Sequence, residues 1–166
     1  MIENIKLLMA TQTGSAEDVA IQVKEALEES GFNIMWQDLA MLEDISFLRE
    51  ASLILGVVST WGDGEPPDDA VEFFNKLRDS DPLNLPGTPI AILGLGDSGY
   101  DIFCGCGKEL EKELQRHGGR PILARVDCDV WYDEDVATWI NDLREKLLLA
   151  RIPLGPTGQH PPQVID

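Results

Sequence analysis

The chain has 166 residues, and its 13 Lys and Arg against 30 Asp and Glu give a formal net charge of −17. The length lies near the ~150 residues of an average domain, and 43% hydrophobic residues are enough for a core. So negative a chain would be repelled by nucleic acid and by anionic membrane surfaces. No apolar run approaches the ~20 residues of a membrane span, and the N-terminus lacks the layout of a signal peptide. We therefore expect a soluble, cytoplasmic protein.

The three cysteines and two histidines predict neither a disulfide framework nor a metal site. Cys104, Cys106 and Cys128 cannot all pair, which argues against a secreted, disulfide-rich domain. A Cys-Gly-Cys step with one distant cysteine matches no usual spacing of metal ligands, and the histidines add no paired motif. We expect the cysteines to be small, partly buried residues, and we expect no bound metal.

Short apolar segments alternate with amphipathic segments along the chain. Apolar runs typical of buried strands cover residues 5–10, 32–36, 53–59, 89–95 and 122–126. Apolar residues at three- and four-residue steps predict helices over residues 16–28, 68–77, 103–116 and 133–149. The segment 40–50 interrupts this order, and we expect a loop there with at most one helical turn. Repeated strand and helix pairs predict an α/β fold with helices on both faces of a parallel sheet.

The composition changes near the C-terminus. Residues 151–166 hold four of the ten prolines and show no periodicity. We therefore predict one domain over residues 1–150 and a Pro-rich tail over residues 151–166.

The loop after the first strand has the composition of a phosphate site. Ligands of open parallel sheets bind beyond the carboxyl ends of the strands, and residues 11–16 begin at such an end. Three hydroxyls, a glycine and a helix N-terminus suit a phosphate monoester. The segment lacks the motifs of nucleoside triphosphate and dinucleotide sites. Capping of the helix by Thr13 or Ser15 is the open alternative.

The loops after the third and fourth strands each carry an aromatic residue. Trp61 precedes two glycines and several acids, and Tyr100 follows a second glycine-rich turn. A lone Trp at this place would suit a core aromatic that closes the end of the sheet. Because the loops lie at neighbouring strand ends, the two rings could also enclose one planar ligand.

The segments TQTGSAE, STWGDGEPPDDA and GLGDSGYDIFCG together resemble the three FMN-binding loops of the flavodoxin-like family. The family includes short-chain flavodoxins, MioC-type proteins and the FMN domains of sulfite reductase flavoprotein and cytochrome P450 reductase. The resemblance covers about residues 5–149. It implies a flavodoxin-like three-layer sandwich, a five-stranded parallel sheet of order 2-1-3-4-5, and FMN as the cofactor.

The resemblance assigns cofactor contacts to three groups of residues. The phosphate loop comprises Thr11, Gln12, Thr13, Gly14, Ser15 and Ala16. The loop that covers one face of the flavin comprises Ser59, Thr60, Trp61 and Gly62. The loop that reads the polar edge of the ring, with Tyr100 on the other face, comprises Leu95, Gly96, Asp97, Ser98, Gly99, Tyr100, Asp101, Ile102, Phe103 and Cys104. Asp127, expected in a turn after the fifth strand, aligns loosely with an acid near the flavin of some relatives.

The function implied by the resemblance is transfer of single electrons between a reductase and a redox acceptor, without catalytic residues. In the family, the peptide that corresponds to Gly62-Asp63 reorients toward the flavin as its redox state changes. The acids Asp63, Glu65, Asp97 and Asp101 would lower the potential of the flavin. An acidic rim would attract basic-surfaced redox proteins.

Three other functions are compatible with parts of this pattern to different degrees. An FMN-dependent quinone reductase needs room above the flavin, which Trp61 and Tyr100 would fill. An FMN module of a split diflavin reductase is compatible with the sequence, since the Pro-rich tail looks like the start of a linker. A receiver-type signalling module needs acids at the ends of the first and third strands, where Thr11-Gln12 and Ser59-Thr60 stand instead.

Overall fold

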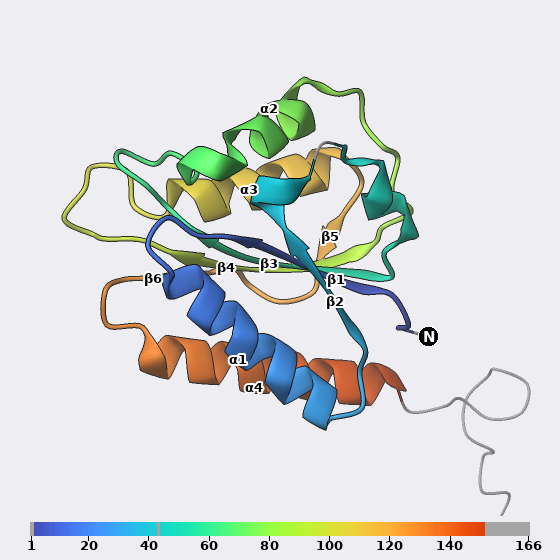
Figure 1. Ribbon diagram of the computed structural model, residues 1–166. Coiled ribbons are helices and arrows are strands. Elements are labelled where there is room, and N and C mark those ends of the chain that lie inside the picture. Colours follow the sequence, from blue (N-terminus) through green and yellow to red (C-terminus); the bar gives the residue numbers. More distant parts are fainter. Residues whose placement is uncertain (1, 43, 152–166) are drawn as a thin grey trace, which may run out of the picture.

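The computed structural model describes residues 2–42 and 44–151 of the chain. A central sheet separates two helical layers (Figure 1). The helices α2 (Val71–Asp79) and α3 (Gly105–Arg116) cover one face, and α1 (Ser15–Glu29) and α4 (Asp133–Arg151) cover the other. The predicted α/β sandwich of three layers is therefore confirmed.

The sheet is parallel throughout. Its strands are β1 (Ile5–Ala10), β2 (Ile34–Asp38), β3 (Leu53–Ser59), β4 (Pro89–Leu95), β5 (Arg120–Pro121) and β6 (Val126–Cys128). The order is β2-β1-β3-β4-β5, and β6 also pairs with β4, so the predicted order 2-1-3-4-5 is confirmed. This order places the carboxyl ends of β1, β3 and β4 side by side at one edge, here called the carboxyl edge.

The edge position beyond β4 differs from the prediction. A single strand over residues 122–126 was expected, but two short strands, β5 and β6, share this position. Between them the chain leaves the ladder, and Arg125 pairs with Glu111 of α3 at 2.6 Å and with Asp127 at 2.8 Å. These charge-assisted hydrogen bonds hold Arg125 in place just before β6 begins.

The second strand begins two residues later than predicted, because the residues before it form the hydrogen-bonded C-terminal cap of the preceding helix. The Phe32 N–H donates to the Leu27 carbonyl at 3.0 Å and the Gly31 N–H to the Glu28 carbonyl at 2.9 Å. Gly31 has φ +89°, the left-handed conformation typical of such a helix end. Phe32 therefore belongs to the end of the helix and not to the strand.

The helices are α1 (Ser15–Glu29), α2 (Val71–Asp79), α3 (Gly105–Arg116) and α4 (Asp133–Arg151). Short 3-10 helices cover η1 (Leu39–Met41), η2 (Ser46–Glu50) and η3 (Asp68–Ala70). The first turns predicted for α2 and α3 are not α-helical, because η3 precedes α2 and Cys104 is left-handed at φ 54°. In the described part of the chain, no helix has both the length and the apolar character of a membrane span.

The last helix is longer than predicted and includes Arg151, the first residue of the predicted tail. The Arg151 guanidinium donates to the carbonyls of Ser30 and Gly31 at 2.6 and 2.9 Å and lies over the Phe32 ring. These contacts attach the end of α4 to the end of α1. The rest of the tail, residues 152–166, lies outside the described residues.

Each face of the sheet has its own hydrophobic core. In β1, Leu7 and Met9 pack under α1 and α4, whereas Leu8 and Ala10 pack under α2 and α3. A strand buried on both faces explains why the sequence shows continuous apolar runs and no polar alternation.

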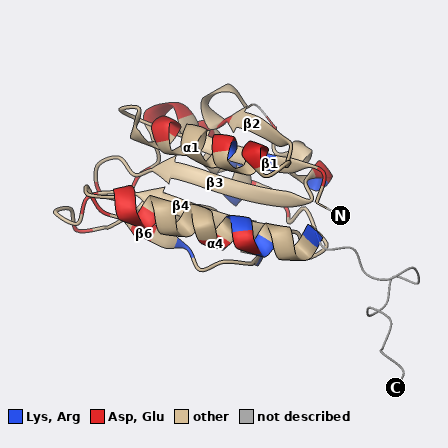
Figure 2. Ribbon diagram, turned by 90° about the horizontal axis from the view of Figure 1, so that it is seen from below, with Lys and Arg blue, Asp and Glu red and all other residues tan. Residues whose placement is uncertain are grey.

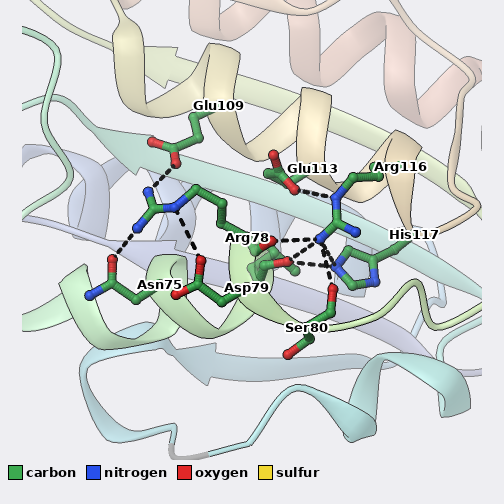
Figure 3. Close-up of polar contacts among 9 residues, drawn as sticks. Asn75, Arg78, Asp79, Ser80, Glu109, Glu113, Arg116 and His117 are labelled. Atoms are coloured by element: carbon green, nitrogen blue, oxygen red, sulfur yellow. Dashed lines mark hydrogen bonds and ion pairs between the residues drawn. The ribbon is translucent and has the colours of Figure 1, made fainter.

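A polar cluster joins α2 to α3 at the edge opposite the carboxyl edge (Figure 3). Arg116 donates to the carbonyls of Leu77, Arg78 and Ser80 at 2.7 to 3.1 Å and thereby caps the C-terminus of α2. His117 is fully buried, accepts from the Leu83 N–H at 2.9 Å and lies 2.7 Å from the Leu77 carbonyl. The cluster therefore connects the C-terminal ends of the two helices, at the end of the molecule away from the carboxyl edge.

Candidate functional site

A cavity of about 320 Å³ opens at the carboxyl edge of the sheet. Its wall is formed by the loops that follow β1, β3, β4 and β6. The volume lies within the ~300–1,000 Å³ typical of small-molecule sites, and the place is where open α/β sheets bind ligands.

The loop after β1 leaves the N-terminus of α1 open. Gly14 is the N-cap residue, in the left-handed conformation at φ 100°, and its N–H donates to the Thr11 hydroxyl at 2.9 Å. Within the described chain, no side-chain capping hydrogen bond is made at the N-terminus of this helix. The alternative that Thr13 or Ser15 merely caps the helix is therefore wrong, and both residues lie on the cavity wall. The first N–H groups of α1 are available to an anion.

A pair of hydrogen bonds connects this loop to the segment before α2. The Asp68 N–H donates to Gln12 Oε1 at 2.9 Å, and Gln12 Nε2 donates to the Asp68 carboxylate at 3.3 Å. Gln12 thus positions the phosphate-type loop against the chain that follows the Trp61 loop.

The loop after β3 is a tight hairpin that presents Trp61. The backbones of Trp61 and Glu65 exchange two hydrogen bonds, of 2.7 and 2.9 Å. Gly62 and Gly64 both have positive φ, which a hairpin this tight requires. Trp61 is 44% exposed on the cavity wall, so the interpretation as a core aromatic is wrong.

The loop after β4 is stabilised by hydrogen bonds to Asp97 within the loop and to Asp129 in the loop after β6. The Gly99 N–H donates to the Asp97 carboxylate at 2.8 Å, and the Tyr100 N–H donates to the Asp97 carbonyl at 3.1 Å. The Ser98 N–H donates to Asp129 Oδ1 at 3.1 Å, and the Ser98 hydroxyl donates to Asp129 Oδ2. Tyr100 lies on the cavity wall and is 53% exposed.

The two aromatic loops touch each other through glycines. A Cβ on Gly105 would lie 2.6 Å from the Gly64 Cα, and a Cβ on Gly64 would lie 2.6 Å from the Ile102 side chain. Only residues without a Cβ permit this approach, which brings Trp61 and Tyr100 to one cavity.

The structure brings most of the predicted contact residues to the cavity wall. These are Gln12, Thr13, Ser15, Ser59, Thr60, Trp61, Gly62, Leu95, Gly96, Asp97, Tyr100 and Ile102. The others lie in the same three loops but off the wall: Thr11, Gly14, Ala16, Ser98, Gly99, Asp101, Phe103 and Cys104.

Cys104 and Asp127 lie behind the wall. The Cys104 thiol is fully buried, faces the carbonyls of Gly94 and Cys128, and has its pKa raised by burial to about 12. Asp127 belongs to strand β6 and not to the turn after it, and its carboxylate is bound to Arg125. Asp127, which aligns loosely with an acid near the flavin of some relatives, is thus already paired with Arg125.

Two wall residues, Val130 and Tyr132, were missed by the sequence reasoning. They follow β6, and the rule that selected the other loops applies equally to this strand end. Because the last strand was predicted over residues 122–126 and β6 covers Val126–Cys128, the loop after β6 was not predicted as part of the site.

Acidic residues are frequent in the loops at the carboxyl edge, and basic residues do not occur there. The loop segments 11–16, 59–70, 96–104 and 127–135 contain no Lys or Arg, and their acids are Asp63, Glu65, Asp68, Asp69, Asp97, Asp101, Asp127, Asp129, Asp133, Glu134 and Asp135. Figure 2 shows Asp and Glu gathered at the start of α4 and in the loops beside it. Open helix N–H groups and hydroxyls at one end, with two aromatic rings at the other, suit a ligand that joins a phosphate to a planar ring system.

Comparison with known proteins supports this arrangement. A sequence model of the family described as Flavodoxin matches residues 7–139. The chain is 37% identical over 145 residues to the sulfite reductase (NADPH) flavoprotein alpha-component of Bacillus subtilis, covering 87% of this chain and 24% of that relative. A protein of the same name from Photobacterium profundum is 37% identical over 135 residues, or 81% of this chain and 22% of the relative.

The chain therefore spans about a quarter of the length of these curated relatives. Among solved structures, a flavodoxin from Streptococcus pneumoniae TIGR4 superposes with a TM-score of 0.77 at 27% identity. That match covers 89% of this chain and 99% of the other.

Proposed function

The chain belongs to the flavodoxin family, and we propose that it carries FMN in the cavity at the carboxyl edge and passes single electrons between a reductase and a redox acceptor. The observation that carries the proposal is the meeting of an uncapped helix N-terminus with two exposed aromatic rings on one cavity wall. We further propose that residues 1–150 form the FMN-binding domain.

The N-terminus of α1 would hold the phosphate. Thr13 and Ser15 offer hydroxyl donors, and the helix dipole favours an anion beside the N–H groups that follow Gly14. Since this loop contains no Lys or Arg, the phosphate would be bound by neutral donors. Such a site fits the single phosphate of FMN better than a longer, more negative polyphosphate.

Trp61 and Tyr100 would cover the two faces of the flavin ring. When bound, FMN supplies one-electron chemistry through this ring. The peptide between Gly62 and Asp63 would meet the ring edge, and Gly62, at φ +53°, tolerates a change of backbone conformation at little cost. Asp63, Glu65 and Asp97 would oppose negative charge on the ring and so lower its potential.

The acids around the cavity suggest basic proteins as the electron donor and acceptor. Attraction between opposite charges speeds the association of the two proteins, and dissolved salt screens this attraction. Electron transfer should therefore slow as the salt concentration rises. Similarity to part of the sulfite reductase flavoproteins supports the more specific proposal of an FMN module in a diflavin reductase system. A cytoplasmic location is supported by three free cysteines, Cys104, Cys106 and Cys128, all buried as thiols.

The test begins with the cofactor. The purified protein should be yellow and should release FMN, not FAD, on denaturation, as read by chromatography of the supernatant. A stepwise reductive titration should resolve two one-electron steps. Colourless protein that takes up no added FMN would refute the proposal, and a single two-electron step with rapid quinone turnover would favour a quinone reductase instead.

A further inference from the structure

A tryptophan side chain projects into solvent beside the cavity. Trp131 is 91% exposed, the highest value among the large hydrophobic side chains of residues 2–42 and 44–151. Its sequence neighbours Val130 and Tyr132 both line the cavity, but Trp131 itself does not. A side chain so exposed contributes little to the core or to the cavity wall, although it presents a large apolar surface to water.

The loop that carries Trp131 is fixed at both ends. On one side, Asp129 accepts hydrogen bonds from Ser98 and from the Val130 N–H, the latter at 2.8 Å. On the other side, the Tyr132 carbonyl accepts from the Val136 N–H at 2.9 Å and joins the loop to α4. The indole is therefore presented by an ordered backbone, so little conformational entropy would be lost when a partner covers it.

Exposed apolar residues and acids occur in the loops that form this side of the cavity wall. Val130 and Ile102 are each 51% exposed and line the same cavity. The acids of these loops are Asp97, Asp101, Asp129, Asp133, Glu134 and Asp135, and no Lys or Arg occurs in the loop segments that supply them. An aromatic centre within a charged rim is the usual anatomy of a protein interface.

We propose that Trp131 is the apolar anchor of the surface on which a basic electron-transfer protein docks over the cavity. The inference rests on the proposed electron-transfer function. The occupant must be positively charged, because the acidic rim repels nucleic acid, anionic membranes and a second copy of this chain alike. The anchor would insert into an apolar recess of the partner, while the rim acids pair with its cations.

The test measures binding to cytochrome c, a small basic haem protein, by calorimetry at low salt. Trp131→Ala should raise the Kd roughly tenfold, as expected for loss of an interface anchor, and Trp131→Phe should recover most of the affinity. Leu149→Ala is the control, since Leu149 is 68% exposed at the other end of α4. This control should bind like the unaltered protein, and high salt should weaken every complex.

Flavin content and thermal unfolding, measured separately, should be unchanged in Trp131→Ala. Equal affinity of Trp131→Ala and the unaltered protein, or no binding by the unaltered protein, would overturn the proposal. A dimer seen by sedimentation and lost in Trp131→Ala would overturn it in favour of self-association. Calorimetry reports docking whether or not FMN is bound, so absence of FMN would refute the proposed function without deciding the role of Trp131.

Discussion

Ser98 and Asp129 lie 31 positions apart in the chain, yet both the N–H and the hydroxyl of Ser98 donate to the Asp129 carboxylate. Ser98 belongs to the loop that carries Tyr100, and Asp129 precedes Val130 in the loop after β6. One carboxylate therefore sets the distance between two parts of the cavity wall.

This link predicts an acid-sensitive site. Hydrogen bonds from Ser98, and one from the Val130 N–H, hold the pKa of Asp129 below its ordinary value of 3.8. A depressed pKa means that the stabilisation is complete above about pH 4 and disappears as the pH falls through the lower, folded-state pKa. FMN affinity, followed by flavin fluorescence, should accordingly stay constant above about pH 4 and fall as the pH is lowered below that value.

Asp129→Asn tests the origin of that fall. The variant should bind FMN more weakly at pH 7 and should lose less further affinity on acidification, because its side chain carries no charge to titrate. Asp133→Asn, which removes a neighbouring acid with no bond to Ser98, should behave like the unaltered protein. Identical curves for Asp129→Asn and Asp133→Asn would contradict the prediction.

Replacing either aromatic wall residue should weaken FMN binding. Trp61→Ala and Tyr100→Ala should each cost about 0.5–1.5 kcal/mol beyond the loss of buried area, because ring stacking is removed. Titration of the apoprotein with FMN measures the change. Trp131→Ala removes an exposed aromatic that is off the wall and should leave the FMN affinity unchanged; equal losses in all three variants would argue against stacking.

A methyl group on Gly105 should separate the two aromatic loops. Its Cβ would lie 2.6 Å from the Gly64 backbone, an overlap that requires a main-chain shift and costs about 1–3 kcal/mol. We expect Gly105→Ala to unfold at a lower temperature and to bind FMN more weakly.

Gly107→Ala provides the matched comparison for Gly105→Ala. Its Cβ would approach the Gly94 Cα at 3.1 Å, so it strains the packing of α3 on β4 without touching the Trp61 loop. The melting temperature should fall, but FMN affinity should be retained. An affinity loss as large as that of Gly105→Ala would show that general destabilisation, and not loop separation, is the cause.

His117→Ala should destabilise the fold and leave the cofactor site intact. The Leu83 N–H would lose its buried acceptor, which costs about 1–3 kcal/mol, and the cavity left by the ring would add to this loss. Urea unfolding measures the change. Asp79→Ala, which removes a partner of Arg78 at the surface, should shift stability by less than about 0.5 kcal/mol.

Two kinds of residue show how far the sequence could predict the site. The sequence indicates Trp61 and Tyr100 because each belongs to a glycine-rich loop at the end of a buried strand, and the structure places both on one wall. Val130 and Tyr132 were missed because the last strand was predicted over residues 122–126, whereas β6 covers Val126–Cys128. Arg125, which directly precedes β6, pairs with Glu111 of α3, and a contact between such separate segments leaves no local signal in the sequence.

By itself, the sequence determined the alternation of strands and helices, the three loops with site chemistry and the concentration of acids beside them. Periodicity, turn residues and charge are local properties, so they can be read without coordinates. Only the tertiary structure decided which loop residues face the cavity, that Cys104 lies behind it, and that Trp131 stands free in solvent. Those outcomes depend on contacts between distant segments, such as Gly64 with Gly105 and Ser98 with Asp129, which form only when the chain has folded.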